Sequence, residues 1–243
     1  MPSRHARAEL SGGVLHSEAG ERATVHFLER GIQIGPQVSD KLVGEIAGAA
    51  QGRVSFFGRH AEAMTQIQDA QQIDPLSMSV RAASVELLYY ARQNSQAIEA
   101  GKKAVQTDPN FPAAYLFLSR SYLATGKYNE AEEAELKYRE LNGEPEAKRA
   151  ALRRAFETGG IEAAWRWNLE DMKQRESGEY ISPVDEARQQ ARLGQRQAAL
   201  ASLEKSYEIG DGSLVWIKVD PALDSLRQEP RFKNLLGKLH LDS

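Results

Sequence analysis

The hydrophobic positions of the chain follow a helical period over most of its length. In residues 112–144, for example, Tyr115, Leu118 and Tyr122 lie three and four residues apart, so they share one face of a helix. The same spacing recurs before and after this stretch, whereas the strict alternation of apolar and polar residues that is typical of strands is nearly absent. The pattern therefore predicts an all-α protein.

The helical pattern also repeats along the chain. The sequence AEAMTQIQDAQQIDP aligns with SQAIEAGKKAVQTDP, and the Asp74-Pro75 and Asp108-Pro109 pairs that end them lie 34 residues apart. A fixed period of this size indicates stacked helix-turn-helix units, each of which buries its apolar face against its neighbours. With Asp-Pro at the end of a unit, the predicted units are 44–77, 78–111, 112 to about 144, about 145–179 and about 180–213.

A short motif marks the predicted turn between the two helices of each unit. It is complete at Gly126, Tyr128 and Ala131, and reduced forms start at Gly58, Gly159 and Gly194, while the second unit has Arg92 in place of the glycine. Glycine ends a helix at little steric cost, and a small alanine lets two helices approach closely. The motif therefore predicts one helical hairpin per unit.

These small, aromatic and proline positions resemble the tetratricopeptide repeat family, whose units have about 34 residues. The resemblance covers about 170 residues and is weakest in the fourth unit, where Trp165 and Trp167 depart from the pattern. It implies a right-handed superhelical solenoid whose concave groove binds a protein or an extended peptide. We expect the two tryptophans to pack at an irregular repeat junction.

The two ends of the chain differ from the repeats. Residues 1–20 lack periodicity and are expected to be flexible, and residues 21–43 are expected to form a helical extension or a degenerate repeat. Residues 44–213 hold the five units, and residues 214–243 are predicted to cap the open end of the stack through the apolar stripe of Leu235, Leu236 and Leu239.

The last stretch also resembles the tail of tetratricopeptide arrays in some bacterial multidomain regulators. The resemblance rests on Leu214, Val215, Trp216, Ile217, Asp220, Pro221, Asp224, Leu226, Arg227, Pro230, Arg231 and Phe232. It implies a regulatory or sensory arm of a bacterial signalling or transcription system, which is an alternative to a free scaffold. Whether the chain is part of a larger protein stays open.

Composition narrows the function classes. The 243 residues carry a formal net charge of −3, so no overall basic character favours a nucleic acid or an anionic membrane as partner. The chain has no cysteine, which excludes disulfides and thiolate metal sites. No apolar run is long enough for a signal peptide or a membrane helix, so the simplest expected location is the cytoplasm.

Motifs for catalysis, metals and cofactors are missing. The five histidines are scattered, and no nucleotide-binding glycine loop or nucleophile elbow occurs. The acidic run EAEEAELKYREL predicts solvated surface pairs such as Glu135 with Arg139. We therefore expect no enzyme activity, cofactor or metal, although an inter-repeat pocket around Trp165 and Trp167 for a small molecule or an enzyme reaction is kept as a third alternative.

The predicted site is the inner lining of the solenoid. In the family that the chain resembles, the first helix of each unit faces the groove, and by register this lining comprises Glu86, Tyr89, Leu116, Arg120, Leu123, Arg149, Arg153, Phe156 and Arg188. The recurring arginines suggest a clamp for a carboxylate or an acidic extended peptide. The alternative is that they pair with neighbouring glutamates. Self-association through an apolar stripe at Leu42, Val43 and Ile46 is a further possibility.

Overall fold

The computed structural model describes residues 58–176 and 178–242, together with residues 48, 50 and 52. This part of the chain is helical and contains no strand, which confirms the all-α prediction. Its helices are α3 (His60–Ile73), α4 (Met78–Tyr90), α5 (Asn94–Thr107), α6 (Pro112–Ala124), α7 (Tyr128–Leu141), α8 (Glu146–Arg175), α9 (Pro183–Arg192), α10 (Arg196–Glu208) and α11 (Pro230–Lys238). The expectations for residues 1–43, including the stripe at Leu42 and Val43, lie outside the described residues, as does Ile46.

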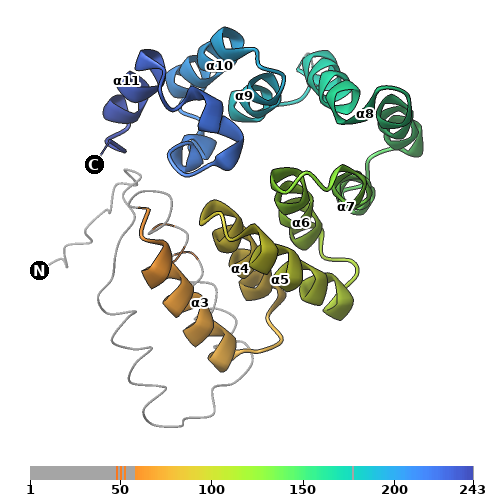
Figure 1. Ribbon diagram of the computed structural model, residues 1–243, viewed down its shortest axis with the longest axis vertical. Helices are drawn as coiled ribbons and strands as arrows, with labels where there is room; N and C mark the ends of the chain where they lie inside the picture. The colour runs from red at the N-terminus through yellow and green to blue at the C-terminus, as the bar shows by residue number, and fades with distance from the viewer. Residues whose placement is uncertain (1–47, 49, 51, 53–57, 177, 243) are drawn as a thin grey trace, which may run out of the picture.

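Successive helices pack as hairpins that follow one another along a curved array (Figure 1). α4 packs on α5, α6 on α7, and α9 on α10, and α6 also packs on α4 and α5 of the preceding hairpin. The turn glycines Gly126 and Gly194 have φ values of 72° and 71°, in the left-handed region that favours glycine. The structure is thus the expected helical solenoid.

The small residue of each hairpin is buried, as the motif predicts. Ala63, Ala97 and Ala199 are completely buried, and Ala131 is almost so. These alanines lie in the first turns of α3, α5, α10 and α7, and in the last three of these the second helix of a hairpin meets the first. A larger side chain at any of them would overpack the hairpin, at a cost of about 1–3 kcal/mol.

The fourth hairpin is folded from one nearly continuous helix, α8. Its backbone leaves the helical region only at Gly159 and Gly160, and Gly160 has a φ of 66°. A Cβ atom on Gly159 would come within 2.7 Å of the Cβ of Ala163, so this position needs glycine. The break lies where the sequence predicts the turn of this unit, between segments 146–158 and 161–175.

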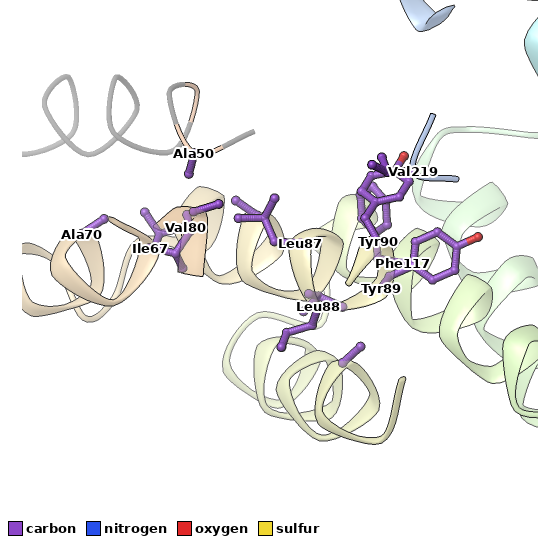
Figure 2. Close-up of a cluster of buried hydrophobic side chains, with 14 residues drawn as sticks. Ala50, Ile67, Ala70, Val80, Leu87, Leu88, Tyr89, Tyr90, Phe117 and Val219 are labelled. Carbon is purple, nitrogen blue, oxygen red and sulfur yellow. The ribbon is translucent and has the colours of Figure 1, made fainter. Parts of the chain in front are cut away.

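Two buried clusters hold the two ends of the described array. The first centres on α4 and includes Leu87, Tyr89, Tyr90 and Phe117, with Val219 from near the C-terminus beside them (Figure 2). The second joins α9 and α10 to the C-terminal elements and contains Leu203, Phe232 and Leu235 among others. Leu236 and Leu239 pack against this second cluster, so α11 covers it as a capping helix.

The segment before α11 does more than cap the stack. It forms two short 3₁₀ helices, η1 (Gly212–Trp216) and η2 (Pro221–Leu226), and returns toward α4 (Figure 1). Val219 therefore belongs to the α4 cluster, 129 positions after Tyr90 in the sequence. The sequence predicted a cap over the open end, but it did not predict this contact, which closes the array into a ring-like shape around its concave side.

Candidate functional site

A cavity of about 760 Å³ lies on the concave side of the array. α4, α6, α7, α8 and α9 contribute its walls, and Ser213 and Trp216 of η1 close one side of it. The first helices of successive hairpins meet here because each buries its outer side against the second helix of its own hairpin. The cavity thus lies where the sequence predicts the binding site, on the inner lining of the solenoid.

The structure places five of the nine predicted residues in the cavity wall and four elsewhere. The residues that line the cavity are Glu86, Leu116, Arg120, Leu123 and Arg188. The other four, Tyr89, Arg149, Arg153 and Phe156, are outside the lining. Tyr89 is buried behind the wall, with only 2% of its surface exposed.

The arginines of the fourth unit are engaged by glutamates instead. The guanidinium of Arg149 lies 2.6 Å from a carboxylate oxygen of Glu146 and 3.4 Å from one of Glu140. Arg153 approaches Glu146 at 3.9 Å, and its side chain is about half exposed. Phe156 packs against the small cluster of Leu136, Leu152 and Ala164. For Arg149 and Arg153, the alternative of pairing with neighbouring glutamates describes the structure.

Arg188 lines the cavity but is bound by two carboxylates of its own chain. Its Nε donates to Asp220 at 2.6 Å, and a terminal nitrogen donates to Asp185 at 2.6 Å. The other carboxylate oxygen of Asp220 accepts hydrogen bonds from the Tyr89 hydroxyl at 3.3 Å and from the backbone N–H of Ala222 at 2.9 Å. Asp220 thus joins α4, α9 and the start of η2.

The pKa directions agree with this network. Burial alone would raise the pKa of the Asp220 carboxyl, but the charges of Arg188 and Arg120 and the hydrogen bonds from Arg188 and Ala222 hold it below its usual range. Burial alone would lower the pKa of Arg188, and the carboxylates of Asp220 and Asp185 reverse that effect. Both groups of the buried pair are therefore charged at neutral pH.

Two other arginines of the cavity wall differ from Arg188. Among the residues that the structure describes, no carboxylate forms an ion pair with Arg120 or Arg192. The Arg120 guanidinium lies over the Phe117 ring, 5.2 Å from its centre, and Arg192 makes a long hydrogen bond of 3.4 Å to the Gln189 side chain. Both side chains are half-buried and line the cavity. The sequence prediction included Arg188 of α9 but missed Arg192, because the repeat register that selected Arg188 did not select position 192.

The charges on the α7 and α8 side of the cavity are mutually neutralised. Arg139, whose side chain is 12% exposed, is bound by Glu135 at 2.8 Å and by Glu144 at 2.9 Å and also donates to Asn168. The expected Glu135–Arg139 pair is confirmed, but it is not solvated, because α8 covers the arginine. Arg175 likewise pairs with Glu179 at 2.8 Å. The two arginines of the wall that form no ion pair with a described carboxylate, Arg120 and Arg192, are therefore on the α6 and α9 side.

An aromatic group adjoins Arg120, whose guanidinium lies over the Phe117 ring. The rings of Tyr90 and Trp216 stack with their centres 4.7 Å apart and an angle of 9° between their planes. Phe117 meets Tyr90 edge-on at 6.2 Å. In the sequence, Trp216 stands out only as one of the residues that carry the C-terminal resemblance. No local pattern around it predicts its contact with Tyr90 of α4.

Other chemistry finds little support within the described part of the chain. No group of three histidine, aspartate or glutamate side chains there is arranged to hold a metal ion. None of the helices placed by the structure is both long and apolar enough to cross a membrane. Trp165 and Trp167 are absent from the lining of the cavity, and Trp167 packs against the Leu136 cluster beneath Arg139.

The comparisons with known proteins agree with this geometry. Residues 88–152 match the model of a family described as "Tetratricopeptide repeat". The matched segment runs from the end of α4 to the first half of α8 and includes Arg120 on the cavity wall. No curated protein matches the chain at a significant level.

Proposed function

Because residues 88–152 are tetratricopeptide repeats, we propose that this chain is a non-catalytic scaffold that binds a segment of a partner protein in its concave cavity. Stacked helix pairs of this kind generally serve as surfaces for protein interactions. For this chain, the proposal is supported by the cavity on the concave side of the array. It lies on the inner side of the array, where α4, α6, α7, α8 and α9 contribute to one wall.

The size and lining of the cavity support a peptide as its occupant. A volume of about 760 Å³ is within the range of roughly 300–1,000 Å³ that is usual for ligand pockets. Leu116, Leu123 and Ile181 offer apolar contacts along its wall, and Tyr138 and Tyr180 add aromatic surface. Apolar and aromatic positions interrupted by charges are typical of surfaces that bind an extended chain.

The charge distribution supports an acidic segment in particular. Arg120 is the one predicted arginine that both lines the cavity and lacks an ion pair with a carboxylate of the described residues. Arg149, Arg153 and Arg188 are engaged within the chain. The clamp expected from the sequence is thus reduced to the α6 and α9 side of the groove, and an acidic residue of the partner would bind there.

The test uses the absence of cysteine from the sequence. Tyr180 lines the cavity and is 69% exposed, whereas Tyr128 is 42% exposed and lies outside the lining. Tyr180→Cys and Tyr128→Cys each receive the same photo-crosslinker, and the labelled proteins are irradiated in native lysate. We expect one partner protein to be crosslinked from position 180 and not from position 128. Equal crosslinking from both positions, or crosslinking from position 128 alone, would reject the cavity as the binding site.

A further inference from the structure

The buried apolar clusters divide the described array into two bodies. Three of its four clusters hold helices α3 to α8, which form the N-terminal body. The fourth cluster joins α9, α10, η1, η2 and α11, which form the C-terminal body. Among the described residues, Val219 is the one residue of the C-terminal body that is buried in a cluster of the other body, and Trp216 packs against the same cluster (Figure 2). Apolar burial therefore joins the two bodies where the C-terminal segment returns to α4.

The junction between α8 and α9 lacks such burial. No cluster of buried apolar residues in the described ranges contains members of both helices. An ion pair between Lys205 of α10 and Glu176 at the end of α8 crosses this junction, and both side chains are about half exposed. Exposed ion pairs are screened by water and salt and contribute little to stability. The junction can therefore bend without the disruption of a buried apolar cluster.

The closing interface is the contact of the C-terminal body with α4 and the turn that follows it. It consists of Trp216, Val219, Asp220 and Asp224 on one side and Tyr89, Tyr90 and Arg92 on the other. Its polar contacts are long or exposed to water. The Tyr89 hydroxyl lies 3.3 Å from Asp220, and the ion pair of Arg92 with Asp224 leaves both side chains about half exposed.

The returning segment is held more firmly by its own body than by α4. Its residues in the cluster of the C-terminal body are Leu214, Ile217, Leu223 and Leu226, whereas only Val219 is buried against α4. Arg188 of α9 also binds Asp220 at 2.6 Å in an ion pair that is almost completely buried. Because hydrophobic stabilisation grows with the apolar area removed from water, release from α4 costs less than release from α9 and α10. The segment should therefore move with the C-terminal body.

We propose that the closing interface opens and closes in the folded protein, with residues 212–226 staying on the C-terminal body, and that this motion gates the cavity. The cavity is lined by both bodies, since Leu116 and Arg120 belong to the first and Arg188 and Trp216 to the second. Partial openings of this kind need less free energy than global unfolding. The gating role rests on the proposed function, whereas the opening itself needs no partner.

The experiment uses single cysteines in the full chain, which has none of its own. Val219→Cys places a thiol in the closing interface, Leu223→Cys in the cluster of the C-terminal body, and Val80→Cys in the α4 cluster; the three native side chains are at most 6% exposed. The rate of reaction with a thiol reagent in native buffer is divided by the rate of the same variant unfolded in urea. We expect Val219→Cys to react at least tenfold faster than the other two, because only its thiol is uncovered when the bodies separate.

Three further substitutions connect the opening with the closing interface. Trp216→Ala removes the ring stack on α4, and Asp224→Ala removes the half-exposed ion pair, which keeps the test valid if Trp216→Ala does not fold. Each should speed the reaction of Val219→Cys at least twofold and leave that of Leu223→Cys unchanged. Tyr207→Ala, which removes a 39% exposed ring of the C-terminal body outside the interface, is the matched control and should change neither rate.

Three results would overturn the opening. Slow reaction at all three cysteines would show that the interface opens only when the chain unfolds. Fast reaction at positions 219 and 223 together, with slow reaction at position 80, would show that the segment leaves α9 and α10 as well. A rate at position 219 that neither Trp216→Ala nor Asp224→Ala changes would show that these contacts do not hold the interface closed.

The gating role is tested with the photo-crosslinker at position 180. Asp224 lies outside the cavity lining, so Asp224→Ala weakens the closing interface without removing a wall contact. We expect it to raise the crosslink yield after a short incubation, and an unchanged yield would overturn the gate. If position 219 reacts fast but no partner is crosslinked in any variant, the opening stands and the proposed function fails. Crosslinking with slow reaction at position 219 gives the opposite result.

Discussion

Helices α4 and α9 are both the first helix of a hairpin and both face the cavity, yet they are buried by opposite means. α4 is MSVRAASVELLYY, and its buried residues include Val85, Leu87 and Tyr90. α9 is PVDEARQQAR, and its buried residues include Glu186, Arg188 and Gln190. The apolar helix is buried by packing, whereas the polar helix combines a short apolar side, Val184, Ala187 and Ala191, with buried polar groups such as Arg188 and Gln190 that meet partners. Burial alone thus does not reveal which forces hold a helix.

The same residue links the two helices. Asp220 accepts a hydrogen bond from Tyr89 on α4 and forms an ion pair with Arg188 on α9. Its side chain is 1% exposed and that of Arg188 is 8% exposed. The polar helix therefore depends on a partner that the C-terminal segment brings in, while the apolar helix depends on its neighbours in the array.

Removing this link should have the largest effect. Asp220→Ala leaves the buried Arg188 with only the partly exposed Asp185, and breaking one side of a buried ion pair costs about 3–5 kcal/mol. The measurement is urea unfolding. Asp224→Ala, which removes a half-exposed carboxylate from η2, the 3₁₀ helix that Asp220 caps, is the control and should cost roughly 0–1 kcal/mol. Similar losses for the two variants would show that Asp220 is not the link between α4 and α9.

The next effect separates packing from hydrogen bonding. Leu87→Ala truncates a side chain that is 1% exposed in α4 and should cost about 2–5 kcal/mol through lost burial and a residual cavity. Gln190→Ala in α9 removes the acceptor of a 2.9 Å hydrogen bond from Ser202, whose hydroxyl also lies 3.4 Å from Glu186. That loss should be about 1 kcal/mol. The free energy of unfolding of each variant measures the difference, and equal values would contradict the contrast between the two helices.

The hairpins of α4 to α7 could be predicted from the sequence because their signals are local. Ala97 and Ala131 recur at the same place in each unit, and the Asp-Pro ends give the period directly. The environment of α9 could not be predicted in this way. Its apolar side packs on α10 as a hairpin predicts, but the partner of its buried arginine, Asp220, comes from a segment later in the chain.

The residues of the candidate site also differ in whether the sequence could predict them. Arg120 and Leu116 could be placed on the inner wall because the register of the third unit is clear. Arg188 was placed there too, but its pairing with Asp220 was not foreseen, and Arg192 was missed entirely. The pairing depends on the return of η1 and η2 to α4, which brings together residues up to 132 positions apart. No periodic pattern in the sequence records such a contact.

Acidification should weaken the ion pair of Asp220 with Arg188 on α9 without removing a side chain. The folded state holds the pKa of Asp220 below its usual value of about 3.9, so the unfolded chain takes up this proton first. The stabilising contribution of Asp220 is therefore complete above that unfolded value and is lost as pH falls through the folded pKa. The effect should be smaller than truncation, because a protonated carboxyl still forms hydrogen bonds.

The measurement is the free energy of unfolding of the wild type and of Asp220→Asn between neutral pH and about pH 3. Asparagine cannot take up the proton, so the wild type should lose its advantage over the variant as pH falls toward the lower end. An advantage that stays constant with pH would show that the charge on Asp220 does not contribute to stability.

The smallest expected effect concerns Arg92, where the second unit departs from the glycine of the other turns. Arg92 has a φ of 60°, which costs a residue with a Cβ about 1–2 kcal/mol. Its side chain reaches the returning segment, with one nitrogen 2.5 Å from Asp224 and another donating to the backbone oxygen of Val219 at 3.3 Å. At Arg92, the contacts that close the array therefore offset the cost of a strained backbone.

Two substitutions separate the backbone strain at Arg92 from the contacts of its side chain. Arg92→Ala and Arg92→Gly both lose the contacts to Asp224 and Val219, but only glycine relieves the backbone, so Arg92→Gly should be more stable by about 1 kcal/mol. Gly126→Ala is the control, because its φ is 72° and an added Cβ would meet no atom within 4 Å; it should lose about the same amount. Denaturant unfolding measures all three. If Arg92→Ala proves as stable as Arg92→Gly, backbone strain does not explain why glycine occupies this turn elsewhere, and the closing contacts alone would account for the choice of arginine.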